Sequence, residues 1–492
     1  MHRKSTPWRR IRRGVLAALL GCAFLTATSA RGAESAIDPS TPRLPLNIVF
    51  LLADDLGAHD LGCYGADLHE TPHIDRLARQ GTRFTQAYAM SVCSPTRAAL
   101  MTGRHAARLH LTTWREASLN RESDAAKTPR PLLPPVTEFD LPTDLPTLPG
   151  ILRESGRLCF HVGKWHLGDA AHPPERYGFD LNIGGTHWGA PPTYFHPFRG
   201  PFGTSGEFRH VPGLGLGREG DYLTDRLADE AIRLIEQADD RPFFLNLWFH
   251  APHTPIEGKP DLVENYRRKM RPEYHHQNPK YAAMIHALDQ NVGRVLDALD
   301  RRGLASRTLV VFASDNGGYT NHFRGEKVTD NSPLRSGKGS LYEGGIRVPL
   351  IVRLPGVIRP GSECPEPVLC TDLFHTVAEL AGAPKASLAA GLDGQSLVPL
   401  LRNPDSRLSR EALHFHFPHY YSTTAPVSAI RARNWKLLQY HENQRLELYD
   451  LASDPGESRD LASTETTRAA SLRDQLNRWL RDVGAQMPQP SR

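Results

Sequence analysis

The stretch from residue 91 to residue 104 holds the residue types best suited to covalent chemistry. Cys93 and Arg97 precede the apolar run 98–101, which predicts a helix that begins near Cys93. Unpaired N–H groups at a helix N-terminus favour an anion, and an arginine one turn away adds a fixed charge that suits sulfate or phosphate oxygens. The stretch therefore predicts a reactive, anion-binding position at Cys93. A buried cysteine ahead of an ordinary helix fits this stretch alone equally well.

Two pairs of oxygen-bearing side chains follow strongly apolar segments. Asp54 and Asp55 end one apolar run, and Asp315 and Asn316 end another. Adjacent carboxylates repel each other unless a cation lies between them, so the first pair indicates a hard metal ion held by oxygen ligands. An acidic turn that caps the next helix is the simpler alternative for Asp54 and Asp55. The second pair repeats the arrangement of apolar run, oxygen ligand and glycine, which favours the metal site.

Basic side chains follow three further segments. Lys164 and His166 end a short predicted strand, where alternation places them on one face, and such a pair suits anion binding and proton transfer. His253 follows another apolar run and lies between two prolines. Lys338 lies in a glycine-rich loop, which on its own is typical of a flexible surface turn.

Alternating strands and helices must position these side chains. Continuous apolar runs are typical of parallel strands covered by helices on both faces, and ligands of such sheets bind at the carboxyl ends of the strands. We therefore predict an α/β fold with a large mixed, mostly parallel sheet sandwiched by helices. Residues 71–81 are predicted to form a helix with Thr71 as its N-cap and Gly81 as its end. The predicted strands cover 46–53, 243–249, 308–314 and 348–354 and begin again at 158, and further helices cover 223–235 and 281–299.

The chain is predicted to contain two folded parts. A catalytic domain covers residues 45–402, and a small C-terminal α+β subdomain, residues 410–487, completes the active-site cleft. The boundary is placed near 402–410, where the sequence turns polar and contains a proline. Short strands are expected near 413–417, 428–433 and 435–440, followed by a helix near 467–483.

The first 30 residues have the pattern of a secretory signal peptide. Six basic residues within 1–13 precede the apolar run 14–25 and a group of small residues, with cleavage expected after residue 30 or as late as 33. A lipoprotein processing site at Cys22 and twin-arginine export are the alternatives. The signal predicts an exported protein, periplasmic or extracellular. Because no later run is apolar enough to predict a transmembrane helix, we expect the mature protein to be soluble, with lipid anchoring through Cys22 as the alternative.

Charge and cysteine content narrow the function further. The chain has 59 basic and 54 acidic residues, which are interleaved, so nucleic-acid binding is not supported. An exported compartment permits disulfides. Apart from Cys22 and Cys93, the chain has four cysteines, Cys63, Cys159, Cys364 and Cys370. A disulfide between Cys364 and Cys370 would close a short loop, but four free thiols fit the sequence equally well.

In this order, the segments resemble the type I, formylglycine-dependent sulfatases of the alkaline phosphatase superfamily. Cys93-Ser-Pro-Thr-Arg97, with the trailing Leu-Met-Thr-Gly-Arg, matches the Cys-x-Pro-x-Arg maturation motif of that family. The likeness covers the chain from about residue 46 to the C-terminal part. The other matching motifs are Asp54-Asp55, Gly163-Lys-Trp-His166, Ala251-Pro-His253, Asp315-Asn316 and Gly337-Lys338.

This resemblance implies a role for each matching residue. Cys93 would be oxidised to formylglycine before folding by a formylglycine-generating maturation enzyme. A divalent cation, Ca²⁺ with Mg²⁺ as the alternative, would be held by Asp54, Asp55, the modified residue 93, Asp315 and Asn316. The cation and Lys338 would bind sulfate oxygens, Arg97 and His166 would hold the aldehyde hydrate, and Lys164 and His253 would face the leaving oxygen.

The resemblance implies hydrolysis of sulfate esters, and export favours a sulfated carbohydrate as the substrate. One rival is a phosphonate monoester or phosphodiester hydrolase of the same superfamily, which would share the cysteine motif and much of the metal site. Another is a non-catalytic glycan-binding protein in which Cys93 stays unconverted. Substrate specificity is expected to come from residues 105–149, 182–220, 319–335 and 414–427.

Overall fold

The structure, a computed structural model, describes residues 46–491 apart from 121, 124–126, 204–205 and 385–390. All of these residues belong to one compact unit, Leu44–Arg492. The predicted signal peptide and Cys22 lie outside the described residues. Within the described part of the chain, no helix has both the length and the apolar character needed to cross a membrane.

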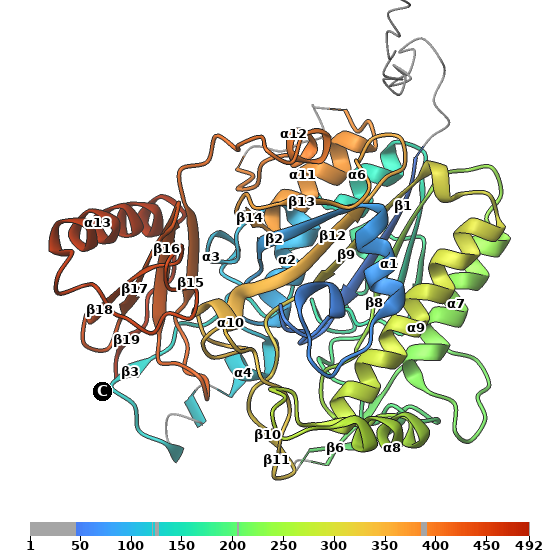
Figure 1. Ribbon diagram of the computed structural model, residues 1–492, viewed down its shortest axis with the longest axis horizontal. Coiled ribbons are helices and arrows are strands. Elements are labelled where there is room, and N and C mark those ends of the chain that lie inside the picture. Colours follow the sequence, from blue (N-terminus) through green and yellow to red (C-terminus); the bar gives the residue numbers. More distant parts are fainter. Residues whose placement is uncertain (1–45, 121, 124–126, 204–205, 385–390, 492) are drawn as a thin grey trace, which may run out of the picture. The chain divides into compact units, whose positions relative to one another are not determined.

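A nine-stranded sheet forms the centre of this unit (Figure 1). Along β1, Ile48 and Phe50 join one hydrophobic core, whereas Val49 and Leu51 join the other. The strand is therefore buried on both faces, which explains its continuous apolar run. In spatial order the strands are β13 (Ser362–Cys364), β2 (Thr82–Tyr88), β12 (Arg347–Arg353), β9 (Thr308–Ser314), β1 (Asn47–Ala53), β8 (Phe243–Trp248), β4 (Leu158–Gly163) and β5 (Leu181–Ile183), and β14 (Val368–Leu369) also pairs with β2.

Strand direction decides which loops meet at the carboxyl edge. β12 runs antiparallel to β9 and β2, whereas the other strand pairs of the sheet are parallel. The segment that precedes β12 therefore lies at the same edge as the residues that follow β1, β8 and β9. The predicted mixed, mostly parallel sheet is confirmed.

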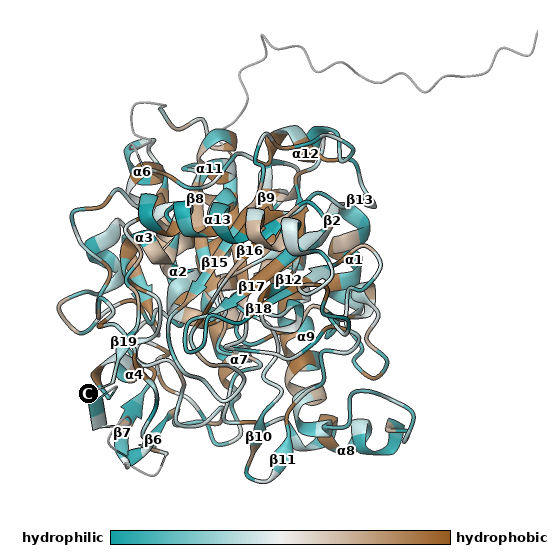
Figure 2. Cartoon of the chain, turned by 90° about the vertical axis from the view of Figure 1, so that its left-hand side faces the viewer, coloured by the Kyte–Doolittle hydropathy of each residue, from teal (hydrophilic) through white to brown (hydrophobic). Residues whose placement is uncertain are grey.

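Helices cover both faces of the sheet (Figure 1), and Figure 2 shows the hydrophobic residues concentrated on the strands between them. The helices on one face contribute to the first core, and those on the other face contribute to the second. The first group is α2 (Cys93–Thr102), α6 (Leu148–Glu154), α11 (Thr371–Leu380) and α12 (Val398–Arg402). The second is α1 (Pro72–Gln80), α7 (Leu223–Gln237) and α9 (Pro279–Arg301), and α8 (Pro260–Lys269) packs on α9.

Helix α1 has the predicted ends but a different cap. Thr71 occupies the N-cap position, but its hydroxyl donates to Asp75 (3.0 Å) and does not cap the helix. The carboxylate of Asp289, on α9, accepts instead from the N–H groups of His73 (3.1 Å) and Ile74 (2.7 Å). The prediction that Thr71 caps this helix is therefore wrong, because a carboxylate distant in sequence satisfies the helix end.

The C-terminal part is an antiparallel sheet with one helix. One face of the sheet, including Ile430 and Leu437, packs on α13, and the opposite face, including Phe415 and Leu438, joins the first core of the main sheet. Residues 402–410 connect α12 to this sheet, and the division into two domains there stays a prediction. The elements are β15 (Leu413–Phe417), β16 (Val427–Ala432), β17 (Trp435–Tyr440), β18 (Leu446–Asp450) and α13 (Thr466–Asp482).

The structure has no disulfide between Cys364 and Cys370, which the sequence left as one alternative, because all five described cysteines are free. Cys364 pairs with Phe84 on β2, and Leu369, next to Cys370, pairs with Tyr88. Four residues of extended chain separate these partners by about 13 Å. The two cysteines therefore lie too far apart for a disulfide, which requires Cα atoms within roughly 7 Å.

Candidate active site

The carboxyl edge of the central sheet brings the predicted metal ligands together. Asp54 and Asp55 follow β1, and Asp315 and Asn316 follow its neighbour β9. The Asp54 N–H donates to the carbonyl of Ala251 after β8 (3.1 Å), and the Asp55 N–H donates to Asp315 Oδ1 (3.2 Å). Asn316 Nδ2 donates to Asp55 Oδ1 (2.8 Å). These bonds hold three strand ends and their side chains as one cluster.

Arg97 is fully buried and ties α2 to this cluster. Its Nε and Nη2 donate to Asp315 Oδ2 (3.0 and 2.7 Å), its Nη1 donates to the carbonyl of Lys164 (3.1 Å), and its guanidinium lies 5.0 Å from the ring centroid of Trp248. Its Nη2 also lies 3.7 Å from Asp54 Oδ2, so the polar contacts of Arg97 are with Asp315, Asp54 and Lys164. Its predicted contact with the hydrate of residue 93 stays a prediction.

Cys93 begins α2, as the sequence predicts, and only 3% of it is exposed. Its Sγ lies 3.4 Å from His166 Nδ1. Burial raises the pKa of the Cys93 thiol, but the positive charges of Lys164, His166 and Lys338 lower it below its ordinary value overall. The surroundings therefore stabilise negative charge on the side chain of residue 93.

Two buried lysines face the aspartates. Lys164 Nζ donates to Asp54 Oδ2 (2.6 Å), and Lys338 Nζ lies 2.7 Å from Asp55 Oδ1 and 2.9 Å from Asp55 Oδ2. Burial raises the pKa of each carboxyl, but the facing lysine brings it below its ordinary value. By contrast, burial and the charge of Asp54 raise the pKa of Asp315.

Two histidines follow β8 at the same edge. His253 Nε2 lies 3.6 Å from Asp55 Oδ2, and burial together with Lys338 lowers the pKa of His253 to about 4. His250 was not assigned from the sequence, although it belongs to the same segment. It is buried, and neither ring nitrogen has a hydrogen-bond partner among the described residues. Burial and Lys164 hold its pKa well below the ordinary value, so His250 is neutral.

The donor set fits a divalent cation. Asp54 Oδ1 and Asn316 Oδ1 are both buried and lack a hydrogen-bond partner among the described residues. Such orphaned acceptors cost about 1–3 kcal/mol each, and they are the ligands that hard cations prefer. Ligand atoms of Asp54, Asp55 and His253 also lie within 4.8 Å of one another. These residues therefore offer a coordination site made mainly of oxygen atoms.

Glu116, on α4 (Arg115–Leu119), is a charged group that the sequence did not indicate. Its Oε2 lies 3.6 Å from His166 Nε2, and Arg209 Nη2 lies 3.8 Å from its Oε1. Burial raises the pKa of Glu116, but His166 lowers it to about 2 overall. His166 thus has Cys93 at one ring nitrogen and a carboxylate at the other. The only sequence signal was its place in a segment expected to shape specificity.

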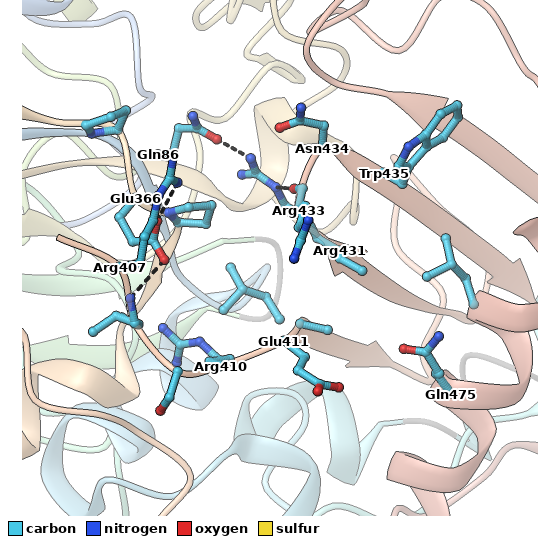
Figure 3. Close-up of a pocket in the computed structure, with 18 of the residues that line it drawn as sticks. Gln86, Glu366, Arg407, Arg410, Glu411, Arg431, Arg433, Asn434, Trp435 and Gln475 are labelled. Carbon is cyan, nitrogen blue, oxygen red and sulfur yellow. Dashed lines mark hydrogen bonds and ion pairs between the residues drawn. The ribbon is translucent and has the colours of Figure 1, made fainter. Parts of the chain in front are cut away.

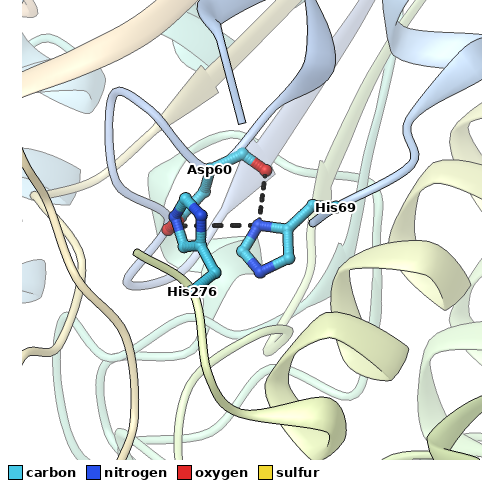
Figure 4. Close-up of side chains that lie close together, drawn as sticks. All are labelled: Asp60, His69 and His276. Carbon is cyan, nitrogen blue, oxygen red and sulfur yellow. Dashed lines mark hydrogen bonds and ion pairs between the residues drawn. The ribbon is translucent and has the colours of Figure 1, made fainter. Parts of the chain in front are cut away.

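A second cluster of acidic and histidine side chains lies near this edge (Figure 4). His276 Nε2 lies 3.1 Å from Asp60 Oδ1, and its Nδ1 lies 2.6 Å from Asp67 Oδ1. Burial lowers the pKa of His276, but the two carboxylates raise it to about 9 overall, whereas burial lowers the pKa of His69 to about 4. The cluster therefore contains one charged imidazole between two carboxylates and one neutral imidazole.

This second cluster supports the turn that carries the predicted metal ligands Asp54 and Asp55. Asp60 Oδ2 accepts from the Gly57 N–H (2.7 Å) and from the Tyr281 hydroxyl (2.7 Å), and that hydroxyl also lies 3.0 Å from the Asp55 carbonyl. Because the oxygens of Asp60 already accept several hydrogen bonds, we interpret it as a structural support for Asp55.

The fold and the site define a class. A mixed sheet flanked by helices, with carboxylates and anion-binding groups at its carboxyl edge, is the architecture of alkaline phosphatase-like hydrolases, and the similar solved structures share it. The sulfatase family model matches residues 46–383, and the chain belongs to the sulfatase family. It is a sulfuric ester hydrolase. A second model, described as N-sulphoglucosamine sulphohydrolase, C-terminal, matches residues 337–486.

Individual relatives match over most of their length. A sulfatase of Formosa agariphila is 33% identical to this chain. The match covers 88% of this chain and 88% of that protein. Human arylsulfatase A is 32% identical, with 85% of this chain and 83% of its own covered. The crystal structure of Ps i-CgsB in complex with k-i-k-neocarrahexaose has 29% identity and a TM-score of 0.71, and the match covers 89% of this chain and 93% of that one.

Proposed function

We propose that this sulfatase desulfates carbohydrates by means of a formylglycine derived from Cys93. The observation that carries the proposal is the position of Cys93: it lies at the N-terminus of α2, 3.4 Å from His166, in surroundings that stabilise negative charge. The match of residues 93–97 to the maturation motif supports the conversion. Maturation removes the sulfur and oxidises the carbon that bore it to an aldehyde. The hydrate of this aldehyde carries two hydroxyls, and Sγ marks the place of one of them.

In the first step, one hydroxyl of the hydrate gives its proton to solvent water and its oxygen attacks sulfur. The bond between sulfur and the sugar oxygen breaks, and the departing oxygen takes a proton. Lys164 and His253 are the candidate donors. The pKa of about 4 leaves His253 neutral at neutral pH, which favours Lys164.

The second hydroxyl explains why an ordinary serine would not suffice. A serine would remain as a stable sulfate ester, whereas the hydrate can expel the sulfate. His166 removes the proton of the second hydroxyl, the bond between carbon and the sulfate oxygen breaks, and sulfate leaves as the aldehyde reforms. Glu116, 3.6 Å from His166 Nε2, stabilises the imidazolium that this step produces.

Fixed charges hold the sulfate group during both steps. Lys338 would bind its oxygens, and Arg97 keeps Asp315 in place. Asp54, Asp55, Asp315 and Asn316, with residue 93, would hold Ca²⁺, for which Mg²⁺ is the alternative. When bound, the cation would supply positive charge that stabilises the negative charge of the reacting group.

A carbohydrate substrate is supported by the relative solved with a neocarrahexaose. Export to the periplasm or beyond, which the first 30 residues predict, would bring the enzyme to such substrates. The phosphodiester hydrolase stays the rival within this fold, because the same cluster would bind a phosphate group. The pair of lysines and His166 favours the sulfatase reaction.

Three measurements test this proposal. Mass spectrometry of the peptide that contains residue 93 should find a species lighter than cysteine, formylglycine, in active enzyme co-expressed with a maturation enzyme. Cys93→Ala should fold normally and lose turnover. Turnover of p-nitrophenyl sulfate should exceed that of bis-p-nitrophenyl phosphate. An intact thiol in fully active enzyme would refute the mechanism, and a preference for the phosphodiester would select the rival.

A further inference from the structure

A deep groove separate from the candidate active site lies beside the C-terminal sheet (Figure 3). Its volume is about 1080 Å³, and none of the proposed catalytic residues or metal ligands lines it. One wall comes from Gln86 of β2 and from residues 365–367 and 407–413. The other wall comes from the β16–β17 hairpin, residues 431–435, and from α13.

The C-terminal sheet connects this groove with the active site. At the groove end of the sheet Leu413 pairs with Arg431, and at the opposite end Phe417 leads toward Thr423. The Thr423 hydroxyl donates to the carbonyl of Lys338 (2.7 Å). Ten residues separate Leu413 from Thr423, so the groove and the active site are at most roughly 35 Å apart along this path. One extended polymer chain can span such a distance.

Five arginines and two glutamates line the groove, so its lining carries a net positive charge. Two of the arginines are committed to the protein itself. Arg410 donates to both oxygens of Asp372 (2.8 and 2.7 Å), and the buried Arg431 donates to Gln86 and to Tyr88. These contacts make the walls rigid. Arg407 pairs with Glu366 (2.8 Å), but 77% of its side chain remains exposed.

The remaining two arginines are available to a ligand. Arg433 lies exposed at the tip of the hairpin and makes no ion pair within the described part of the chain. Arg468 lies with its guanidinium 4.1 Å from the ring centroid of Trp435, is 44% exposed, and contacts Glu465 at 3.3 Å. The guanidinium of Arg468 thus lies over the partly exposed indole of Trp435, and Arg433 lies two residues from Trp435 on the same hairpin.

We propose that this groove binds a sulfated stretch of a polysaccharide whose scissile sulfate lies elsewhere, in the active site. The proposal rests on the proposed function for the choice of polymer. Arginine forks suit sulfate oxygens, and a basic groove raises the local concentration of a polyanion. A nucleic acid would satisfy the same charges, but a sulfuric ester hydrolase meets sulfated polymers as substrates. The groove thus holds the polymer while the active site removes single sulfates.

The test compares two double variants in a Cys93→Ala background, so that binding does not depend on turnover. Arg433→Gln with Arg468→Gln removes the two available charges. Arg267→Gln with Arg268→Gln removes two charges from α8, where these side chains are 56% and 69% exposed. Binding of fluorescent dextran sulfate, with unsulfated dextran as the uncharged probe, is measured over a range of salt concentrations.

We expect the groove variant to bind dextran sulfate about tenfold more weakly than the parent. The slope of its log affinity against log salt concentration should fall by an amount that corresponds to about two fewer released counterions. The α8 variant should bind nearly as tightly as the parent, and dextran should bind to none of them. An equal loss in both variants would overturn the groove assignment. Single-stranded DNA bound as tightly, with the same dependence on Arg433 and Arg468, would overturn the assignment to a sulfated glycan.

Turnover separates this proposal from the proposed function. With Cys93 restored, the groove variant should hydrolyse p-nitrophenyl sulfate at the parent rate, because this small substrate does not reach the groove. Its KM for a sulfated polysaccharide should rise while kcat stays unchanged. A parent enzyme that fails to hydrolyse p-nitrophenyl sulfate would contradict the proposed function, whereas the binding result would still decide whether the groove takes the polymer.

Discussion

The clearest test of the cation site is the variant Asn316→Ala. Asn316 is buried, and its Nδ2 donates to Asp55 Oδ1 (2.8 Å) and to the Gly317 carbonyl (3.0 Å). Its Oδ1 has no partner among the described residues. Without calcium, the loss of two hydrogen bonds should destabilise the variant by about 1–2 kcal/mol. With calcium, the variant should also lose part of the stabilisation that the cation gives to the parent.

The size of that second effect follows from linkage. Free Ca²⁺ at one hundred times its Kd stabilises the folded protein by about 2.7 kcal/mol. A folded unit of roughly 450 residues has an unfolding entropy of about 0.9 kcal/mol/K, so the Tm should rise by about 3 °C. If the loss of one ligand weakens binding tenfold, the stabilisation falls to about 1.4 kcal/mol and the Tm shift to about 1.5 °C.

Scanning calorimetry on chelated protein, with Ca²⁺ and Mg²⁺ added separately, measures both effects. Asn246→Ala is the matched control, because Asn246 is also buried, its Oδ1 also lacks a partner among the described residues, and it lies inside β8. The control should lose stability but keep the full calcium-dependent shift. An undiminished shift in Asn316→Ala, or no shift in the parent, would refute the ligand assignment.

Three further predictions concern the rest of the network. Glu116→Gln should lower kcat for p-nitrophenyl sulfate about ten- to one-hundredfold with little change in KM, because a carboxylate charge this close, 3.6 Å from His166 Nε2, stabilises the imidazolium by about 1.4–3 kcal/mol; an unchanged kcat would remove Glu116 from the mechanism. Lys436→Met should lower the free energy of unfolding by about 3–5 kcal/mol in urea titrations, because it removes the ammonium group that lies 2.8 Å from the buried Glu457 and 3.0 Å from the buried Glu343. Lys327→Met, which removes the exposed ion pair with Asp330, should have little effect. The pKa of His276 is raised from 6.5 to about 9. Its protonation therefore contributes about 3 kcal/mol to the free energy of unfolding below pH 6.5, and this contribution is lost as the pH rises to about 9. Urea titrations at pH 6 and pH 9.5 should show this loss in the parent and not in His276→Gln.

Sequence patterns indicated the sheet and brought the predicted metal ligands to one edge because both depend on local signals. An apolar run followed by oxygen ligands predicts a buried parallel strand and its carboxyl end, and parallel strands share that edge. This pattern alone therefore predicts that Asp54 and Asp315 lie at the same edge of the sheet. Lys338 reaches the same edge only because β12 is antiparallel. The sequence of the glycine-rich loop before β12 does not indicate the direction of that strand.

The parts that sequence reasoning missed depend on packing between distant segments. Glu116 meets His166 because α4 folds over the edge, and nothing in its local sequence distinguishes it from a surface glutamate. Asp289 caps α1 across a separation of more than 200 residues. The pair Cys364 and Cys370 looked close in sequence, but extended pairing along β2 keeps the two cysteines apart.

The burial of Cys93 sets an order of events during synthesis. The groups that enclose it come much later in the chain: the Thr96 hydroxyl of the same helix donates to the carbonyl of Asp315, 219 residues further on, and the Gly339 N–H donates to the Ser91 carbonyl. At roughly 5–20 residues per second, the ribosome needs about 10 to 45 s to reach Asp315 after residue 96. During that interval the cysteine cannot yet be enclosed. For the proposed conversion of Cys93, the fold thus leaves a period of access that ends when β9 and β12 complete the sheet.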